Sequence, residues 1–122
     1  MECFKHRHFA AWAKSERITD EALRGAIIEI ESGLVDADLG HGLFKKRIAK
    51  KGQGKRGGYR VFLAFKAKNR AFFVYGLTKN ERENVTPKEL RIYRKLAEIY
   101  LSLDEVGIKK LLKSGEIIEV KR

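Results

Sequence analysis

The middle of this 122-residue chain lacks acidic residues. No aspartate or glutamate occurs between Asp38 and Glu81, and Mg²⁺ requires carboxylate ligands, so this segment by itself excludes a two-metal nuclease centre. The segment holds twelve of the 27 lysines and arginines, and the other 15 nearly balance the 16 acidic residues. Such a basic block in an otherwise near-neutral chain indicates a polyanionic partner, RNA or DNA first of all.

Other residue types are also scarce. A single cysteine, Cys3, excludes an internal disulfide, and a free thiol without a signal peptide predicts a cytoplasmic protein. A single proline and 43% hydrophobic residues exclude a disordered basic tail. No apolar run approaches the roughly 20 residues that cross a bilayer, and the basic residues do not follow one helix, so we expect no membrane partner.

Several motifs that carry chemistry are missing. The chain has no Gly-Lys-Ser/Thr phosphate loop and no nucleophile elbow. His6 and His8 lie two positions apart without a matching cysteine or acidic cluster, which is a poor metal-ligand pattern. We therefore expect no metal and no cofactor.

Apolar spacing and capping signals predict the order helix, helix, three strands, helix, helix and a final segment. Thr19 followed by Asp20 and Glu21 predicts a helix start, and the sequence Thr86-Pro87-Lys88-Glu89 combines a capping box with a proline at the first helical position. The predicted elements are a short strand at 2–5, helices at 8–14 and 19–33, strands at 43–49, 59–66 and 71–77, helices from 86 and at 104–113, and a strand or extended tail at 116–120.

This order predicts one α+β domain over residues 1–122, with a C-terminal helical extension from about residue 86. The helices are expected to pack on one face of a small, mainly antiparallel sheet. The other face would then be free to carry the basic side chains. The glycine-rich residues 50–58 (KKGQGKRGG) are predicted to form a mobile basic loop between two strands.

The basic residues suggest cleavage of RNA without a metal, because RNA carries its own nucleophile, the 2′-hydroxyl. A lysine crowded by other cations can act as a base, and arginine matches phosphate oxygens. Lys45, Arg47 and Arg60 lie on or beside predicted strands, which hold side chains more rigidly than loops do. The alternative is that these residues only bind phosphates or an acidic protein.

Three segments then resemble a known family. They are residues 43–49 (LFKKRIA), 57–61 (GGYRV) and 73–85, which begins FVYG and ends KNERENV. In this order and spacing they resemble the RelE/ParE superfamily of toxins from type II toxin–antitoxin pairs, most closely its HigB-like branch. The Gly-Tyr-Arg and Lys-x-Glu-Arg-x-Asn segments are its specific parts, and the match runs from about Phe4 to the helix after Thr86.

The resemblance implies a RelE-like fold with two N-terminal helices on a small antiparallel sheet. It implies an mRNA endonuclease, an mRNA interferase that inhibits translation by acting in the ribosomal A site without a metal. It also implies a cognate antitoxin that masks the site, typically a helix-turn-helix protein encoded beside the toxin.

Carried over by position, the resemblance implies a set of catalytic residues around Arg60, which corresponds to an arginine that stabilises the phosphate or the transition state. The predicted catalytic residues are Lys45, Arg47, Arg60, Lys79 and Arg82. The predicted RNA-binding residues are Lys46, Lys50, Lys51, Lys55 and Arg56.

The chain departs from RelE at two positions. Asn80 stands where RelE has an arginine, and Thr86 stands where RelE has its catalytic tyrosine. Tyr59, Tyr75 and Tyr93 are present, but their apolar patterns favour roles in the core. His41 precedes the basic strand, where it could act as an acid or base or simply belong to the loop.

Two other functions remain open from the sequence. A ParE-like toxin would inhibit DNA gyrase with the same fold, and a non-catalytic module would only bind nucleic acid. Apolar residues of the C-terminal extension either pack on the sheet edge or help to bind the antitoxin. These residues are Leu111, Leu112, Ile117, Ile118 and Val120.

Overall fold

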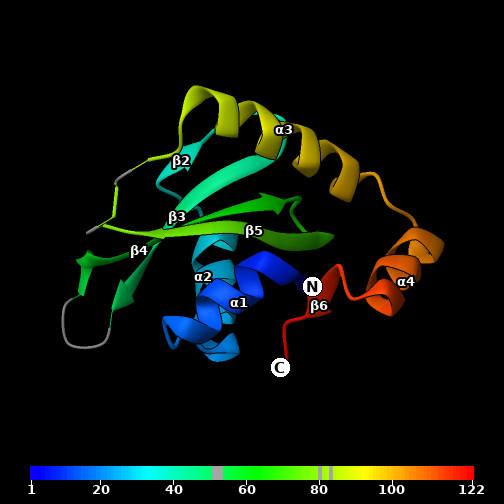
Figure 1. Ribbon diagram of the computed structural model, residues 1–122, viewed down its shortest axis with the longest axis horizontal. Coiled ribbons are helices and arrows are strands. Elements are labelled where there is room, and N and C mark those ends of the chain that lie inside the picture. The colour runs from blue at the N-terminus through cyan, green and yellow to red at the C-terminus, as the bar shows by residue number, and fades with distance from the viewer. Residues whose placement is uncertain (51–53, 80, 83) are drawn as a thin grey trace.

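The protein is described by a computed structural model that covers residues 1–50, 54–79, 81–82 and 84–122 (Figure 1). In chain order its elements are β1 (Glu2–His6), α1 (Arg7–Ser15), α2 (Asp20–Glu31), β2 (Ala37–Asp38), β3 (Leu43–Lys50), β4 (Gly54–Phe65), β5 (Arg70–Thr78), α3 (Pro87–Leu101), α4 (Glu105–Ser114) and β6 (Ile117–Glu119).

The strands of the described residues form one sheet in the spatial order β2-β3-β4-β5-β1-β6. Strands β3, β4 and β5 form an antiparallel meander, β1 pairs in parallel with β5, and β6 pairs antiparallel with β1. The predicted α+β class with a mainly antiparallel sheet is confirmed. Strand β2 was not predicted, because two residues are too few to show an alternation of apolar and polar side chains.

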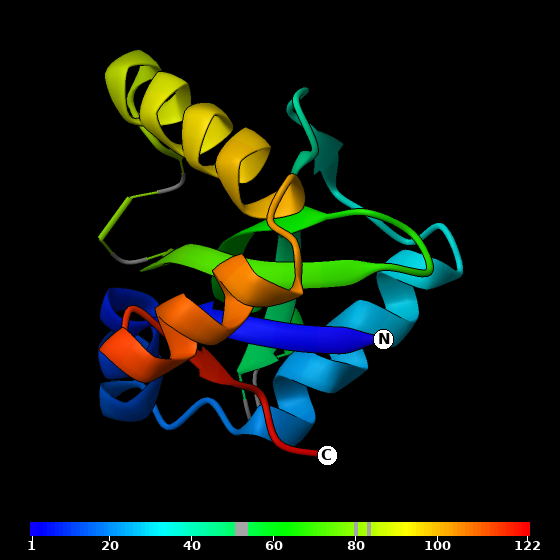
Figure 2. The same cartoon turned by 90° about the vertical axis from the view of Figure 1, so that its right-hand side faces the viewer.

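Helices cover both faces of the sheet, with α1 and α2 on one side and α3 on the other (Figure 2). The prediction that one face would be free for basic side chains is therefore wrong. Alternate residues of a strand point to opposite faces, and both sets on β4 are buried: Val61 and Leu63 toward α1 and α2, Phe62 and Ala64 toward α3.

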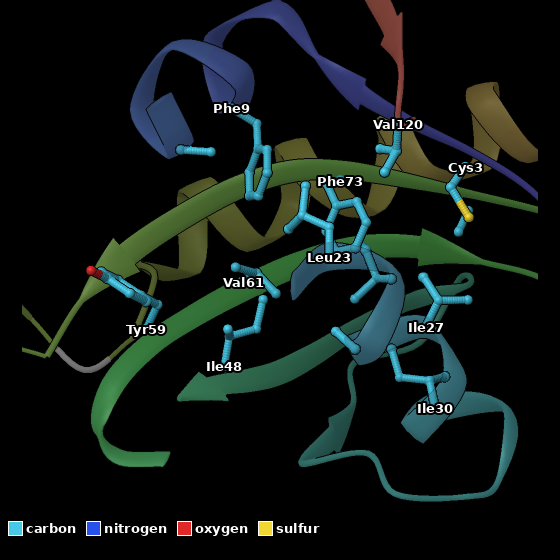
Figure 3. Close-up of a cluster of buried hydrophobic side chains, with 14 residues drawn as sticks. Cys3, Phe9, Leu23, Ile27, Ile30, Ile48, Tyr59, Val61, Phe73 and Val120 are labelled. Atoms are coloured by element: carbon cyan, nitrogen blue, oxygen red, sulfur yellow. The ribbon is translucent and has the colours of Figure 1, made fainter. Parts of the chain in front are cut away.

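The first core lies between the sheet and the two N-terminal helices (Figure 3). Thr19 caps α2 by accepting a hydrogen bond from the Ala22 backbone, and Asp20 and Glu21 occupy the first turn, where the helix dipole favours acids. The predicted helix start is confirmed. The buried side chains of α2 are Leu23, Ala26, Ile27 and Ile30, which pack against the strands.

The second core lies under α3 and α4. The predicted capping box is present: Glu89 N donates to the Thr86 hydroxyl, and Thr86 N donates to the Glu89 carboxylate. An apolar stripe of α3 packs on the sheet with Leu43, Phe62 and Phe72. The stripe consists of Leu90, Tyr93, Leu96, Ala97 and Tyr100.

The C-terminal extension closes one edge of the sheet. Strand β6 pairs with β1, and Ile117 and Val120 are buried. Arg24 of α2 donates to the backbone oxygens of Val120 at 2.7 Å and Lys121 at 3.0 Å. The sheet-edge role expected for these apolar residues is confirmed for Ile117 and Val120, and a contribution to antitoxin binding stays a prediction.

The β3–β4 hairpin is longer than predicted, because residues 54–58 belong to β4 and not to a loop. The pairing extends to Lys50 opposite Gly54, with an irregularity between Ile48 and Lys50. Gly58 permits this approach: a Cβ placed on it would lie 2.0 Å from the Ile48 carbonyl oxygen and 2.8 Å from the Lys50 nitrogen. A glycine is thus required before Tyr59-Arg60, because the backbone of Ile48 and Lys50 leaves no room for a side chain at this position.

We expect Gly58→Ala to destabilise the protein by about 2–3 kcal/mol, because backbone atoms must move to admit the methyl group. Gly25→Ala is the matched control. Gly25 lies inside α2, and a Cβ placed on it would meet no atom within 4 Å, so alanine should stabilise the helix by up to about 1 kcal/mol. Urea unfolding of both variants would measure the difference, and equal effects would contradict the close-contact explanation.

Candidate active site

Three of the predicted catalytic residues lie on the sheet face beneath α3. Lys45 pairs with Phe62, which pairs with Tyr75, so these residues form one row across β3, β4 and β5. The next row on the same face begins with Arg47 opposite Arg60. The structure therefore brings Lys45, Arg47 and Arg60 together, as neighbours in two adjacent rows.

Arg60 is the most unusual member of this group. It is only 8% exposed, and its Nη1 atom is buried without a hydrogen-bond partner among the described residues. A buried guanidinium with an unmade hydrogen bond carries a desolvation cost. Such a group in a folded protein calls for an explanation.

Arg47 has a carboxylate partner. Its Nε donates to Asp36 Oδ1 at 2.8 Å, and its backbone nitrogen donates to Oδ2 at 2.5 Å. Burial alone would raise the pKa of Asp36, but the hydrogen bonds from Arg47 outweigh it and lower that pKa below its usual value. The Arg47 side chain remains 45% exposed, so it can contact a ligand while Asp36 orients it.

Lys45 lies close to the ring of Phe62, with its Nζ 6.0 Å from the ring centroid. Attraction between the ammonium group and the ring face holds the lysine over its own row of the sheet. The ammonium is therefore positioned beside the row that contains Arg60.

Arg82 joins the loop before α3 to the sheet. Its Nη1 and Nη2 donate to the two carboxylate oxygens of Glu89 at 2.6 and 2.7 Å, and Nη2 also donates to the Tyr75 hydroxyl at 2.5 Å. This fork-to-fork pair fixes the loop against the first turn of α3. The structure thus places Arg82 at the predicted site, with several of its donors engaged by the protein itself.

The sequence pattern predicts core positions for two tyrosines that lie beside Arg82. The rings of Tyr75 and Tyr93 stack with centroids 5.0 Å apart, and both are half-buried. Burial, together with Tyr75 and Glu89, raises the pKa of Tyr93 to about 12, so its phenol stays protonated at neutral pH. Their polar ends at the Arg82 site were invisible in sequence, because the apolar spacing of each element accounts for the ring alone.

The Arg82–Glu89 pair predicts a pH-dependent contribution to stability. Hydrogen bonds from Arg82 and from the Thr86 backbone lower the pKa of Glu89 from 4.5 to about 2. A carboxyl group whose pKa is lower in the folded than in the unfolded protein stabilises the fold at pH values above its unfolded pKa. This stabilisation is lost as the pH falls through the folded pKa. Glu89→Gln should therefore be less stable than the unmodified protein at pH 7, and the difference should shrink between about pH 4.5 and 2 in urea titrations. A constant difference would contradict this.

Lys46 does not belong to an RNA-binding surface. Its side chain is 4% exposed and points to the opposite face, where Nζ lies 2.9 Å from Glu29 Oε1 of α2. Its assignment to the RNA-binding set is corrected to a structural ion pair. Alternation along β3 puts Lys46 on the same face as Phe44 and Ile48, and that face is covered by α2.

The other predicted residues lie at the strand ends. Lys50 and Lys79 line a cavity of about 210 Å³ together with Gly57, Gly58 and Tyr59. Tyr59, in the wall of this cavity, packs against Trp12 on the face of the sheet that α1 and α2 cover. The cavity is therefore separate from the Lys45–Arg47–Arg60 group, which lies on the other face. Lys51 and the side chains of Lys55 and Arg56 lie outside the described residues, as does Asn80.

The histidines have local partners. His6 Nδ1 accepts a hydrogen bond from the His8 backbone, and His41 Nδ1 lies 2.9 Å from Glu98 Oε1 of α3. Within the described ranges, no group of three or more His, Cys, Asp or Glu residues is arranged to hold a metal ion. In the same part of the chain, no helix has the length and apolar character to cross a membrane.

Comparison with known proteins gives one assignment. A comparison with curated proteins finds no match to this sequence. The family model of the RelE toxin of the RelE/RelB toxin–antitoxin system matches residues 1–120. The match covers nearly the whole chain, agrees with the α+β sheet described above, and implies a cognate antitoxin. The chain therefore belongs to the RelE toxin family.

Proposed function

We propose that the protein is a metal-independent endoribonuclease that cleaves mRNA in the ribosomal A site and so inhibits translation in the cytoplasm. The observation that carries this proposal is the buried Arg60, whose Nη1 has no partner among the described residues and which lies opposite Arg47 and beside Lys45. Such a group suits a phosphate that gains negative charge in a transition state.

The chemistry requires three tasks. Lys45 takes the proton of the 2′-hydroxyl, whose oxygen attacks the adjacent phosphorus. Arg60 and Arg47 donate to the non-bridging oxygens as charge builds there. The bond from phosphorus to the 5′-oxygen then breaks, which leaves a 2′,3′-cyclic phosphate on one fragment and a 5′-hydroxyl on the other.

The leaving 5′-oxygen needs a proton. Tyr75 lies in the same row as Lys45, and its oxygen already accepts a hydrogen bond from Arg82. That bond orients the phenol and leaves the phenolic proton available for donation. In this proposal Tyr75 takes the role of the tyrosine that Thr86 does not supply, while Arg82 and Tyr93 position it.

The partners follow from the same reading. The substrate is mRNA on the ribosome, and the cognate antitoxin, of the helix-turn-helix type found with HigB-like toxins, would cover the face that carries Arg47 and Arg60. Lys50 and Lys79 are proposed to contact RNA phosphates at the strand ends. Lys51, Lys55 and Arg56 remain predicted RNA contacts.

Mapping of mRNA 5′ ends in a translating extract tests the proposal. The purified protein should produce new 5′ ends inside translated messages, and Arg47→Ala should reduce cleavage at least about tenfold. Lys66→Ala, which changes an exposed lysine in the turn between β4 and β5, should cleave normally. Arrest of translation with intact messages, or inhibition of supercoiling by purified gyrase, would contradict it.

A further inference from the structure

A second feature of the molecule is a cavity of about 330 Å³ between α1 and α3. Its walls are largely aromatic, and the sequence pattern did not single it out. The lining includes His6, His8, Trp12, Tyr75, Gly76 and Tyr93. It lies at the segment of β5 that follows Phe73, with lining residues from α1 and from α3.

The floor of the cavity is the part of β5 beyond its pairing with β1. Strand β1 pairs with β5 only as far as Lys5 opposite Phe73, because the chain turns into α1 at Arg7. Strand β5 continues to Thr78 with only β4 paired beside it among the described residues. Val74, Tyr75 and Gly76 line the cavity, and of these three Tyr75 is the residue that is not buried.

Trp12 forms one wall and carries an unmade hydrogen bond. A Cβ placed on Gly76 would lie 2.1 Å from Trp12 Cζ3, so the indole ring packs directly on the strand. The Trp12 Nε1 atom is buried and has no hydrogen-bond partner in the part of the chain that the structure describes. Buried indole N–H groups normally have an acceptor, and the same residue, Trp12, lines the cavity.

We propose that this cavity binds one nucleobase of the RNA, an inference that rests on the proposed action on RNA. Flat aromatic side chains such as Trp12 and Tyr93 offer stacking surfaces to a base. The volume suits a small planar ligand. Tyr75 lines the cavity and also accepts a hydrogen bond from Arg82 of the candidate active site. A base and a neighbouring phosphate can therefore be held together.

The intrinsic fluorescence of the protein reports on this cavity directly, because Trp12 is its only tryptophan. The probe is a single-stranded RNA hexamer with 2′-O-methyl groups, which cannot be cleaved through its own 2′-oxygen. We expect the hexamer to quench Trp12 emission and to shield Trp12 from acrylamide. A hexamer of abasic sugar phosphates should bind through its phosphates without either effect.

A matched pair of variants measures the contribution of the cavity to affinity. His8→Ala removes an exposed ring at the cavity wall and should weaken hexamer binding about fivefold, as expected for loss of one stacking contact. His41→Ala removes an exposed histidine that pairs with Glu98 outside the cavity, and should bind normally.

The outcomes separate this inference from the proposed function. Hexamer binding with unchanged Trp12 emission overturns the nucleobase site alone, and is the result expected if the cavity accepts apolar side chains of a protein partner. Equal affinities of the His8→Ala and His41→Ala variants also overturn it. Absence of any RNA binding by fluorescence anisotropy overturns the proposed function, and the nucleobase site with it.

Discussion

Replacement of Arg60 by methionine should lower the rate of RNA cleavage at least about 100-fold while leaving RNA binding nearly unchanged. A guanidinium aimed at developing charge contributes mainly in the transition state, and loss of one such donor typically costs about 10²–10³ in kcat. Methionine keeps the length of the aliphatic stem but cannot donate a hydrogen bond. Single-turnover cleavage and hexamer anisotropy would measure the two effects separately.

The same substitution should not reduce stability. Arg60 is 8% exposed, with a buried Nη1 that lacks a partner among the described residues, and an apolar side chain of similar volume often replaces a buried charge at no cost or with a gain. The unfolding temperature of Arg60→Met should equal or exceed that of the unmodified protein. Lys66→Met, at an exposed lysine, serves as the matched control with normal cleavage. A destabilised but active Arg60→Met protein would show that Arg60 is a structural residue.

Substitution of Glu29 by glutamine should destabilise the fold by about 2 kcal/mol, or lower the unfolding temperature by roughly 8 °C. Lys46 is 4% exposed beneath α2, and Glu29 Oε1 lies 2.9 Å from its ammonium group. Without this carboxylate the buried ammonium loses its partner on α2. Asp36, whose pKa is also lowered by the charge of Lys46, offsets part of the loss.

The partner substitution should be milder, and this asymmetry is the test. Lys46→Met keeps most of the aliphatic volume, and the remaining Glu29 carboxylate is 34% exposed and can be hydrated. We expect a loss below about 1 kcal/mol. Thermal unfolding and urea titration of both variants would measure it. A larger loss for Lys46→Met than for Glu29→Gln would contradict this account of the buried pair.

Much of the architecture could be predicted because its signals are local. The caps at Thr19 and Thr86, the apolar stripes of α2 and α3 and the alternation in β4 and β5 each depend on neighbouring residues. The location of α3 could not be predicted in this way. Its stripe indicates that one side is buried but does not say against which face of the sheet, and this missing information led to the wrong prediction of a free basic face.

The candidate site was predictable in part for the same reason. The motif around Tyr59-Arg60 and the basic alternation of β3 placed Lys45, Arg47 and Arg60 on strands, and hairpin pairing then made them neighbours. The ion pairs were not predictable. The carboxylates of Asp36, Glu29 and Glu89 lie outside the acid-free segment, yet they contact cations within or next to it, namely Arg47, Lys46 and Arg82.

The sequence by itself determined the α+β class, the helix starts, the family resemblance and the concentration of positive charge between Asp38 and Glu81. Composition and short-range periodicity are sufficient for these properties. Only the tertiary structure decided which cations are paired with a carboxylate and which face of the sheet they occupy, because ion pairs and burial under a helix depend on contacts between distant segments. It distinguished Arg60, whose Nη1 has no partner among the described residues, from Lys46, which is paired with Glu29 on the opposite face of the sheet.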